Sequence, residues 1–203
     1  MNGFDKRTEK KRQQIKEATF TLLKTKIAKA ITIKEIAQLA QVSQVTIYNY
    51  FESKELLIRE VMKEYIAKQV QQSKDLFQRE LPLKVKIEMI LFQKKATIQD
   101  IEPANFQQLL TDDHELQQFV ESLYQNDIMP LFIEMIQQAQ ARNEINPNLS
   151  IQAILFYLDT WKEASDKLTY DDFSHDDLAQ FTEELIQLFF YGLSPHSMPN
   201  DEN

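Results

Sequence analysis

The stretch from Thr32 to Leu57 reads "TIKEIAQLAQVSQVTIYNYFESKELL" and contains two short helical patterns on either side of a tight turn. Thr32 followed by Glu35 predicts a capping box, in which each side chain satisfies a backbone N–H at the start of a helix. Apolar residues at helical spacing predict the buried stripe of this first helix, which is Ile33, Ile36, Ala37 and Ala40. Because Ala37 is small, it leaves room for a second helix to pack closely there.

The second helix is predicted from Ser43 to Asn49, with Ser43 as its N-cap. Its inward side, with the residues that flank it, is predicted to comprise Val42, Ile47, Tyr50 and Phe51. A longer amphipathic helix is expected before both, over about Thr8 to Lys26, and would support them. Two short helices joined by a turn and supported by a third form a helix-turn-helix, whose second helix enters the major groove of DNA.

The outward side of the second helix carries hydroxyl and amide groups, which suit phosphate oxygens and base edges. A fourth helix is expected to begin at Ser53, where Lys54 adds a cation to a helix start that already favours an anion. The predicted DNA-binding residues are Thr32, Ser43, Gln44, Val45, Thr46, Tyr48, Asn49 and Lys54. Which of them contact bases and which contact phosphates stays open at this point, and plain solvent exposure is the alternative for each.

The charge of the chain is distributed unevenly along the sequence. Residues 1–68 contain 14 Lys+Arg and 8 Asp+Glu, a net charge of +6, whereas the remainder carries −14 of the total of −8. A basic first part on an acidic body suggests that only the first part meets a polyanion such as DNA. Chance clustering of solvated surface charge is the alternative.

Composition narrows the fold and the chemistry. The chain of 203 residues has two glycines and six prolines, and it is rich in residues that favour helices, so an all-α protein is expected. The absence of cysteine excludes disulfides, thiolate metal sites and cysteine nucleophiles. No N-terminal apolar run resembles a signal peptide, and no apolar stretch is long enough to span a bilayer. A cytoplasmic location without membrane contact is therefore expected.

The rest of the chain is predicted to form further helices, for a total of about nine, most of them long and amphipathic and one of them, over 103–110, short. They are expected over 83–99, 103–110, 113–142, 150–168 and 175–192, with Pro130 breaking or kinking the third of these. The predicted architecture is a three-helix DNA-binding domain over 1–53, followed by a larger helical domain for ligand binding and dimerisation over 54–203.

The segment from about Lys11 to Glu64 resembles the DNA-binding domain of TetR-type (TetR/AcrR) transcriptional regulators. The resemblance rests on an ordered combination of motifs, which is T-x-x-x-I-A, then V-S, then I-Y-x-x-F, then S-K-E-x-L. It implies a homodimeric, usually repressing DNA-binding protein. It also implies a pocket for a small molecule in the larger domain and a dimer interface formed by the last two helices of each subunit.

Two residues depart from the pattern of that family. Gln41 stands in the turn where glycine is usual, and a non-Gly residue with positive φ is uncommon, so this turn is expected to be either mildly strained or differently shaped. Val45 stands early in the recognition helix where glycine is frequent, and its side chain would project toward the groove, against a thymine methyl.

Candidate residues of the larger domain follow from apolar patterning. The residues predicted for the effector pocket are Phe92, Phe106, Phe119, Phe132, Met135, Phe156 and Trp161. Those predicted for the dimer interface are Ile154, Tyr157, Leu178, Phe181, Leu185, Leu188 and Phe189. Ordinary core packing is the alternative for each pocket residue. The acidic cluster Asp171, Asp172, Asp176 and Asp177 suits a helix N-terminus, with a cation site as the second choice.

The sequence thus predicts a DNA-binding transcriptional regulator, a repressor, that binds a palindromic operator as a homodimer and responds to an unknown small-molecule effector. The alternative is a protein of the same fold that acts mainly through protein–protein interaction. An enzyme is disfavoured, because the chain has no glycine-rich phosphate loop and no histidine paired with a nucleophile or at metal-ligand spacing. No metal or cofactor is expected.

Overall fold

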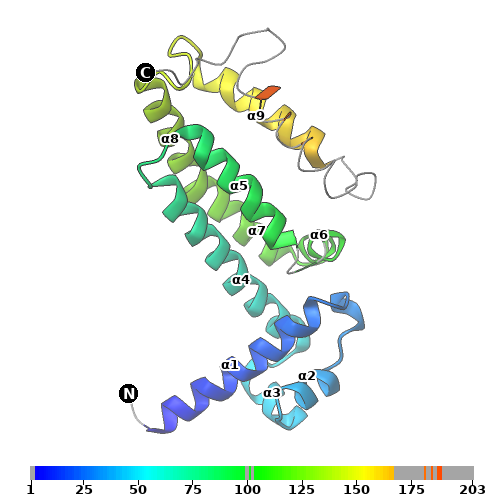
Figure 1. Ribbon diagram of the computed structural model, residues 1–203. Coiled ribbons are helices and arrows are strands. Elements are labelled where there is room, and N and C mark those ends of the chain that lie inside the picture. The colour runs from blue at the N-terminus through cyan, green and yellow to red at the C-terminus, as the bar shows by residue number, and fades with distance from the viewer. Residues whose placement is uncertain are drawn as a thin grey trace. The chain divides into compact units, whose positions relative to one another are not determined.

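The computed structural model describes residues 3–98, 101, 103–166, 181, 184, 187 and 188. That part of the chain contains no strand, which confirms the all-α prediction, and it holds nine α-helices (Figure 1). They are α1 (Gly3–Leu23), α2 (Ile33–Leu39), α3 (Gln44–Phe51), α4 (Lys54–Phe77), α5 (Leu83–Ile98), α6 (Pro103–Asp112), α7 (His114–Leu123), α8 (Met129–Ala141) and α9 (Ile151–Asp166). A 3-10 turn covers Ala28–Ala30 and a π-helical segment covers Tyr124–Ile128.

The helices belong to two compact units, residues 1–145 and 146–203. The first unit contains α1 to α8, and the second contains α9. The expected division into a DNA-binding part over 1–53 and a regulatory part over 54–203 concerns function and stays a prediction.

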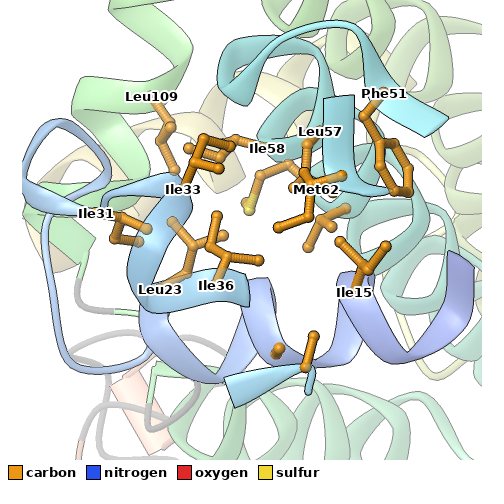
Figure 2. Close-up of a cluster of buried hydrophobic side chains, with 14 of the residues drawn as sticks. Ile15, Leu23, Ile31, Ile33, Ile36, Phe51, Leu57, Ile58, Met62 and Leu109 are labelled. Carbon is orange, nitrogen blue, oxygen red and sulfur yellow. The ribbon is translucent and has the colours of Figure 1, made fainter. Parts of the chain in front are cut away.

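One hydrophobic core holds α1, α2, α3 and the first half of α4 together, as Figure 2 shows. Ile15 of α1, Ile36 of α2 and Ile47 of α3 are each fully buried in it, and α4 adds Leu57 and Met62. Truncating one fully buried residue such as Ile47 to alanine typically costs about 2–5 kcal/mol. The position of α3 is therefore fixed by packing from three neighbouring helices. We call α1 to α3, the residues that link them and the first half of α4 the head.

The long helix α4 continues from the head into a helical bundle (Figure 1). Beyond its contacts with α1 and α3, it packs against α5, α7, α8 and the π-helical segment. Near its end the rings of Phe77 and Phe132 meet edge to face with centroids 6.0 Å apart. The buried ammonium of Lys86 in α5 donates to the Phe77 carbonyl at 2.7 Å. The same helix thus contributes to the head core and to the bundle.

The predicted break near Pro130 is present as a change of helix type. Asp113 caps α7, whose helix then widens into the π-helical segment Tyr124–Ile128, and α8 begins at Met129. Proline has no N–H, and its ring clashes with the carbonyl four residues earlier. In the π-helical segment just before the proline, the Met129 N–H donates to the Tyr124 carbonyl, five residues earlier, so the hydrogen-bond pattern shifts by one residue there.

The bounds of α1 differ from the predicted Thr8 to Lys26. The helix begins earlier, at Gly3, because no breaker stops the polar turn that precedes the apolar pattern, and it ends at Leu23. The expected helix over 175–192 falls largely outside the described residues. In the second unit, α9 starts after Ser150, whose Oγ accepts a hydrogen bond from the Ala153 N–H at 3.2 Å, as expected for a cap.

Candidate nucleic-acid interface

The capping box predicted for α2 is present. Thr32 Oγ1 accepts from the Glu35 N–H at 3.3 Å, and a Glu35 carboxylate oxygen accepts from the Thr32 N–H at 2.9 Å. Lys26 also donates to Glu35 at 2.5 Å. The hydrogen bond from Lys26, followed by those from Thr32, lowers the pKa of Glu35 to about 2. The start of α2 therefore holds a carboxylate that stays charged well into the acid range.

Of the two alternatives expected for the turn between α2 and α3, the structure shows the strained one. Gln41 has φ 54°, in the left-handed region that favours glycine. The Val42 N–H closes the turn by donating to the Ala37 carbonyl at 3.0 Å. Ser43 caps α3, because its Oγ accepts from the Thr46 N–H at 3.0 Å and shares a hydrogen bond of 2.8 Å with the Thr46 hydroxyl.

The helix α3 has one buried and one exposed side. Ile47 and Phe51, four residues apart, face the core, as predicted. The exposed side carries Gln44, Val45, Tyr48 and Asn49. Val45 is 67% exposed and Tyr48 50% exposed, so neither side chain is used by the core. The structure therefore brings these four predicted DNA-binding residues onto one solvent-facing surface.

A charged cluster between α1 and α4 supports the far end of α3. The Arg12 guanidinium stands 4.8 Å from the centre of the Phe51 ring and pairs with Glu60 at 2.5 Å. The nearly buried Lys16 pairs with Glu60 at 3.4 Å and with Glu64 at 2.5 Å. The hydrogen bond with Glu60 raises the pKa of Arg12, against the opposing effect of its partial burial. These cations are therefore engaged within the head.

Lys54 has a structural role that sequence reasoning missed. Its ammonium donates to the Ile31 carbonyl at 3.0 Å and reaches the Ala28 carbonyl at 3.5 Å. It thereby ties the start of α4 to the linker between α1 and α2. The linker lies some 23 to 26 residues away in sequence, so no local pattern announces the contact. The predicted phosphate contact of Lys54 stays a prediction.

A second structural residue missed by sequence reasoning is Asn105 of α6. This buried amide donates to the Leu23 carbonyl at 3.2 Å and to the Lys26 carbonyl at 2.9 Å, and it accepts from the Ala28 N–H at 3.2 Å. Leu109, one turn later, points into the head core beside Ile33 (Figure 2). The helix α6 therefore supplies the groups that satisfy the end of α1.

A third contact between segments distant in sequence joins α4 to the start of α7. Arg59 donates to Asp113 at 2.7 Å and pairs with Glu115 at 2.7 Å. Asp113 also accepts from the Leu116 N–H as the N-cap of α7. Burial alone would raise the pKa of Asp113, but the hydrogen bonds from Arg59 and from the Leu116 N–H hold it below its ordinary value.

The residues predicted for an effector pocket belong to both units. Phe106 and Phe119 pack against the head core, and Phe156 of the second unit is 77% exposed. Met135 lines a cavity of about 130 Å³, with Phe132 beside it in α8. The other lining residues of this cavity are Phe77, Gln78, Leu131, Glu134 and Gln138. The side chains of Phe92 and Trp161 lie outside the described part of the chain. The pocket as a whole stays a prediction.

The residues predicted for a dimer interface belong to the second unit. Ile154 is buried, and the Tyr157 hydroxyl donates to the Leu188 carbonyl at 3.4 Å. Phe181 and Leu188 are half-buried. Leu178, Leu185, Phe189 and the acidic cluster Asp171, Asp172, Asp176 and Asp177 lie outside the described residues. The interface stays a prediction.

The described residues contain neither a cluster of metal-ligating side chains nor a helix suited to a membrane. No group of three or more His, Cys, Asp or Glu side chains in that part of the chain is placed to hold a metal ion. Among the same residues, no helix combines the length and the apolar character needed to cross a membrane.

Residues 15–61 match the family model described as bacterial regulatory proteins, tetR family. No match was found among curated proteins. The matched segment begins in α1 and ends in α4, so it includes the whole of α2, the turn and α3.

Several solved structures share the fold over most of the chain. FadR from Bacillus subtilis in complex with stearoyl-CoA is 19% identical, with a TM-score of 0.59 over 90% of this chain and 99% of that chain. The fatty acid degradation regulator FadR from Bacillus halodurans is 18% identical, with a TM-score of 0.57 over 92% and 97%. A protein from Mesorhizobium loti described as a TetR-family transcriptional regulator is 18% identical, with a TM-score of 0.63 over 90% and 96%.

Proposed function

We propose that this chain, which is a TetR-type transcriptional regulator, represses its target genes by binding a palindromic operator as a homodimer and is released by a small-molecule effector. As a regulator of this type it is not an enzyme, in agreement with the sequence prediction. It would act on double-stranded DNA in the bacterial cytoplasm. The observation that carries the proposal is the solvent-facing side of α3, where polar groups stand on a helix that packing holds in place.

Within that proposal, the head divides its contacts by chemistry. Gln44, Thr46, Tyr48 and Asn49 position α3 and read bases, whereas Thr32, Ser43 and Lys54 hold phosphates. The net charge of +6 over residues 1–68 supports a polyanionic partner. Two heads related by a two-fold axis would bind half-sites whose centres lie about one helical turn, roughly 34–36 Å, apart.

Effector control is proposed to act through α4, because that helix is part of both the head core and the wall of the cavity beside α8. The cavity of about 130 Å³ is smaller than the roughly 300–1,000 Å³ of typical ligand pockets. A ligand entering there has to widen it, and we propose that it does so by displacing Phe77, the lining residue at the end of α4. A fatty acyl-CoA is the first effector class to test, since a structure of similar fold holds stearoyl-CoA.

DNA binding is tested by selecting duplexes from randomised DNA with the full-length protein and measuring fluorescence anisotropy across a salt series. Specific binding at least about a thousandfold tighter than to scrambled DNA is expected, with log affinity falling steeply against log salt. Tyr48→Ala should weaken operator binding, whereas Tyr124→Ala, which changes a tyrosine of similar exposure on the π-helical segment, should not.

Equal and weak binding to every duplex would contradict the proposal. The alternative, a protein of this fold that acts mainly through protein–protein interaction, would then be favoured. Sedimentation of the free protein and of the operator complex tests the dimer, and one protomer per palindromic site would exclude the two-headed arrangement.

The effector is tested by adding stearoyl-CoA, with coenzyme A as the control, to the operator complex. We expect stearoyl-CoA to release the protein from the operator and coenzyme A to leave the complex intact. Gln138→Trp fills the cavity from its solvent side and should abolish the release, whereas Gln137→Trp, at an exposed neighbouring residue that does not line the cavity, should leave it intact. Equal behaviour of the two variants would remove the cavity from the mechanism, and no release in the wild-type protein would remove this effector class.

A further inference from the structure

We infer that α3 reads A·T base pairs, with Val45 packed against a thymine methyl group at the centre of the contact. This inference rests on the proposed function, because it needs α3 in a major groove. It names the base pairs that the exposed side of α3 is chemically able to recognise.

The first support is the absence of charge on α3. Its sequence, "QVTIYNYF", contains no Lys, Arg, Asp or Glu. Guanine is most often read by Arg or Lys donating to its O6 and N7, and cytosine by a carboxylate accepting from its N4 amino group. Lys54, the first cation after the helix, directs its ammonium to the carbonyls of Ile31 and Ala28. The side chains of α3 therefore lack the usual groups for reading G·C pairs.

The second support is the exposed valine itself. Val45 is 67% exposed in the first turn of α3, two residues before the buried Ile47, and it does not pack against the head core. A β-branched residue also lowers helix propensity relative to alanine, so folding gains nothing from valine at this site. An apolar side chain in this position gains free energy when it covers apolar surface, and the thymine C5-methyl is the apolar group that a major groove presents.

The third support is the pair of amides beside Val45. Gln44 precedes it, and Asn49 follows one turn later on the same exposed side. Neither amide is used in a hydrogen bond among the described residues, whereas the Thr46 hydroxyl is already shared with Ser43. Asn and Gln side chains read adenine through its N6 and N7. Amides for adenine and a branched apolar group for thymine together match the two partners of one base pair.

The first test is the composition of the selected operator. Full-length protein should enrich half-sites in which the base pairs under α3 are A·T, and at least one thymine there should be invariant. Enrichment of G·C pairs at those positions would overturn the inference while leaving the proposed function intact. Failure to enrich any sequence would contradict the proposed function itself, and the inference with it.

The second test removes single methyl groups from the DNA. Each thymine of the half-site is replaced in turn by deoxyuridine, which pairs in the same way but lacks the C5-methyl. One replacement should weaken binding of the wild-type protein about fourfold, the value expected for exposing one buried methyl or methylene group. No sensitivity to deoxyuridine at any position would overturn the role of the methyl.

The protein side of this test uses Val45→Ala, with Tyr124→Ala as the matched control away from α3. Val45→Ala should bind thymine and deoxyuridine operators equally, and the control should keep the fourfold difference. Because Val45 is exposed and alanine favours helices, the melting temperature of Val45→Ala should match or exceed that of the wild type. A difference that persists in Val45→Ala would assign the methyl contact to another residue and overturn the inference.

Discussion

Gln41 shows how one residue can hold strain inside an otherwise regular motif. Its φ of 54° costs a side chain with a Cβ atom about 1–2 kcal/mol, but glycine much less. Gln41→Gly should relieve this strain, although glycine also raises the conformational entropy of the unfolded chain and so offsets part of the gain. The net increase in the free energy of unfolding should be about 0.5–1 kcal/mol. Urea unfolding measures this. The same substitution at Gln38, an exposed residue of α2, should lower stability, and equal effects at both sites would contradict the explanation.

Lys54 is the second residue whose role depends on its partners. Replacing it with methionine keeps most of its length but removes the donor to the Ile31 carbonyl, and the expected loss is about 1–2 kcal/mol of unfolding free energy. Lys34→Met on the exposed side of α2 should change stability by less than about 0.5 kcal/mol. Urea unfolding compares the two. If Lys54→Met weakens DNA binding without changing stability, Lys54 acts on DNA rather than on the linker.

At the scale of the element, the start of α2 makes stability depend on pH. The pKa of Glu35 falls from 4.5 to about 2 on folding, chiefly through its hydrogen bond from Lys26. A carboxylate with a lowered pKa stabilises the fold above its unfolded pKa, and this contribution is lost as the pH falls through the folded pKa. The contribution of Glu35 should therefore be complete above about pH 4.5 and disappear toward pH 2.

Glu35→Gln isolates this contribution. The urea midpoint of the variant should lie below that of the wild type at pH 7, and the gap between them should close as the pH is lowered toward 2. Asp113 and Glu60 also have lowered pKa values, so both proteins should lose stability in acid for reasons that the variant shares. A gap that stays constant with pH would show that Glu35 acts as a neutral cap.

The elements also show what sequence can and cannot supply. The capping residues Thr32, Ser43 and Ser53 were predictable, because each signal lies within three residues of the N–H that it satisfies. The break near Pro130 was also predictable from local sequence, because proline lacks an N–H and clashes with the carbonyl four residues earlier. Its form as a π-helical segment was not predictable. Whether a helix next to a proline kinks or widens into a π-helical segment depends on packing against its neighbours, which the local sequence does not reveal.

For the candidate sites too, sequence predicts one part and leaves another open. The exposed side of α3 followed from helical periodicity, because Ile47 and Phe51 fix which side is buried. The candidate pocket stays a prediction, because periodicity does not distinguish a pocket aromatic from a core aromatic, and Phe106 and Phe119 pack against the head core. Helical spacing places an aromatic on the inward side of its helix without saying whether a protein side chain or a ligand meets it there.

At the scale of the whole molecule, Asn105 joins segments 82 residues apart. Asn105→Ala should lower the free energy of unfolding by about 2–3 kcal/mol, because it leaves the Leu23 and Lys26 carbonyls and the Ala28 N–H without this partner. Asn105→Asp, which keeps the shape but turns a carboxylate toward the two carbonyls, should cost more. Urea unfolding compares both with Asn126→Ala at an exposed residue, which should be nearly neutral.

The relative stabilities of Asn105→Ala and Asn105→Asp test whether the amide donors of Asn105 hold α6 to the end of α1. If Asn105→Asp were as stable as the wild type, the amide donors would contribute nothing and Leu109 would account for the attachment of α6 to the head.

The absence of charged residues from α3 also affects how duplicated copies of such a protein can evolve new DNA targets. In the proposed function, the speed of finding a target along a genome would depend on attraction to phosphates, supplied by the basic residues of other segments. The choice of target would depend on a few neutral side chains that no buried partner constrains. After gene duplication, exchanges among such side chains at Gln44, Val45 and Asn49 leave the net charge and the core unchanged. Descendants can therefore acquire new targets while they inherit the ancestral search rate.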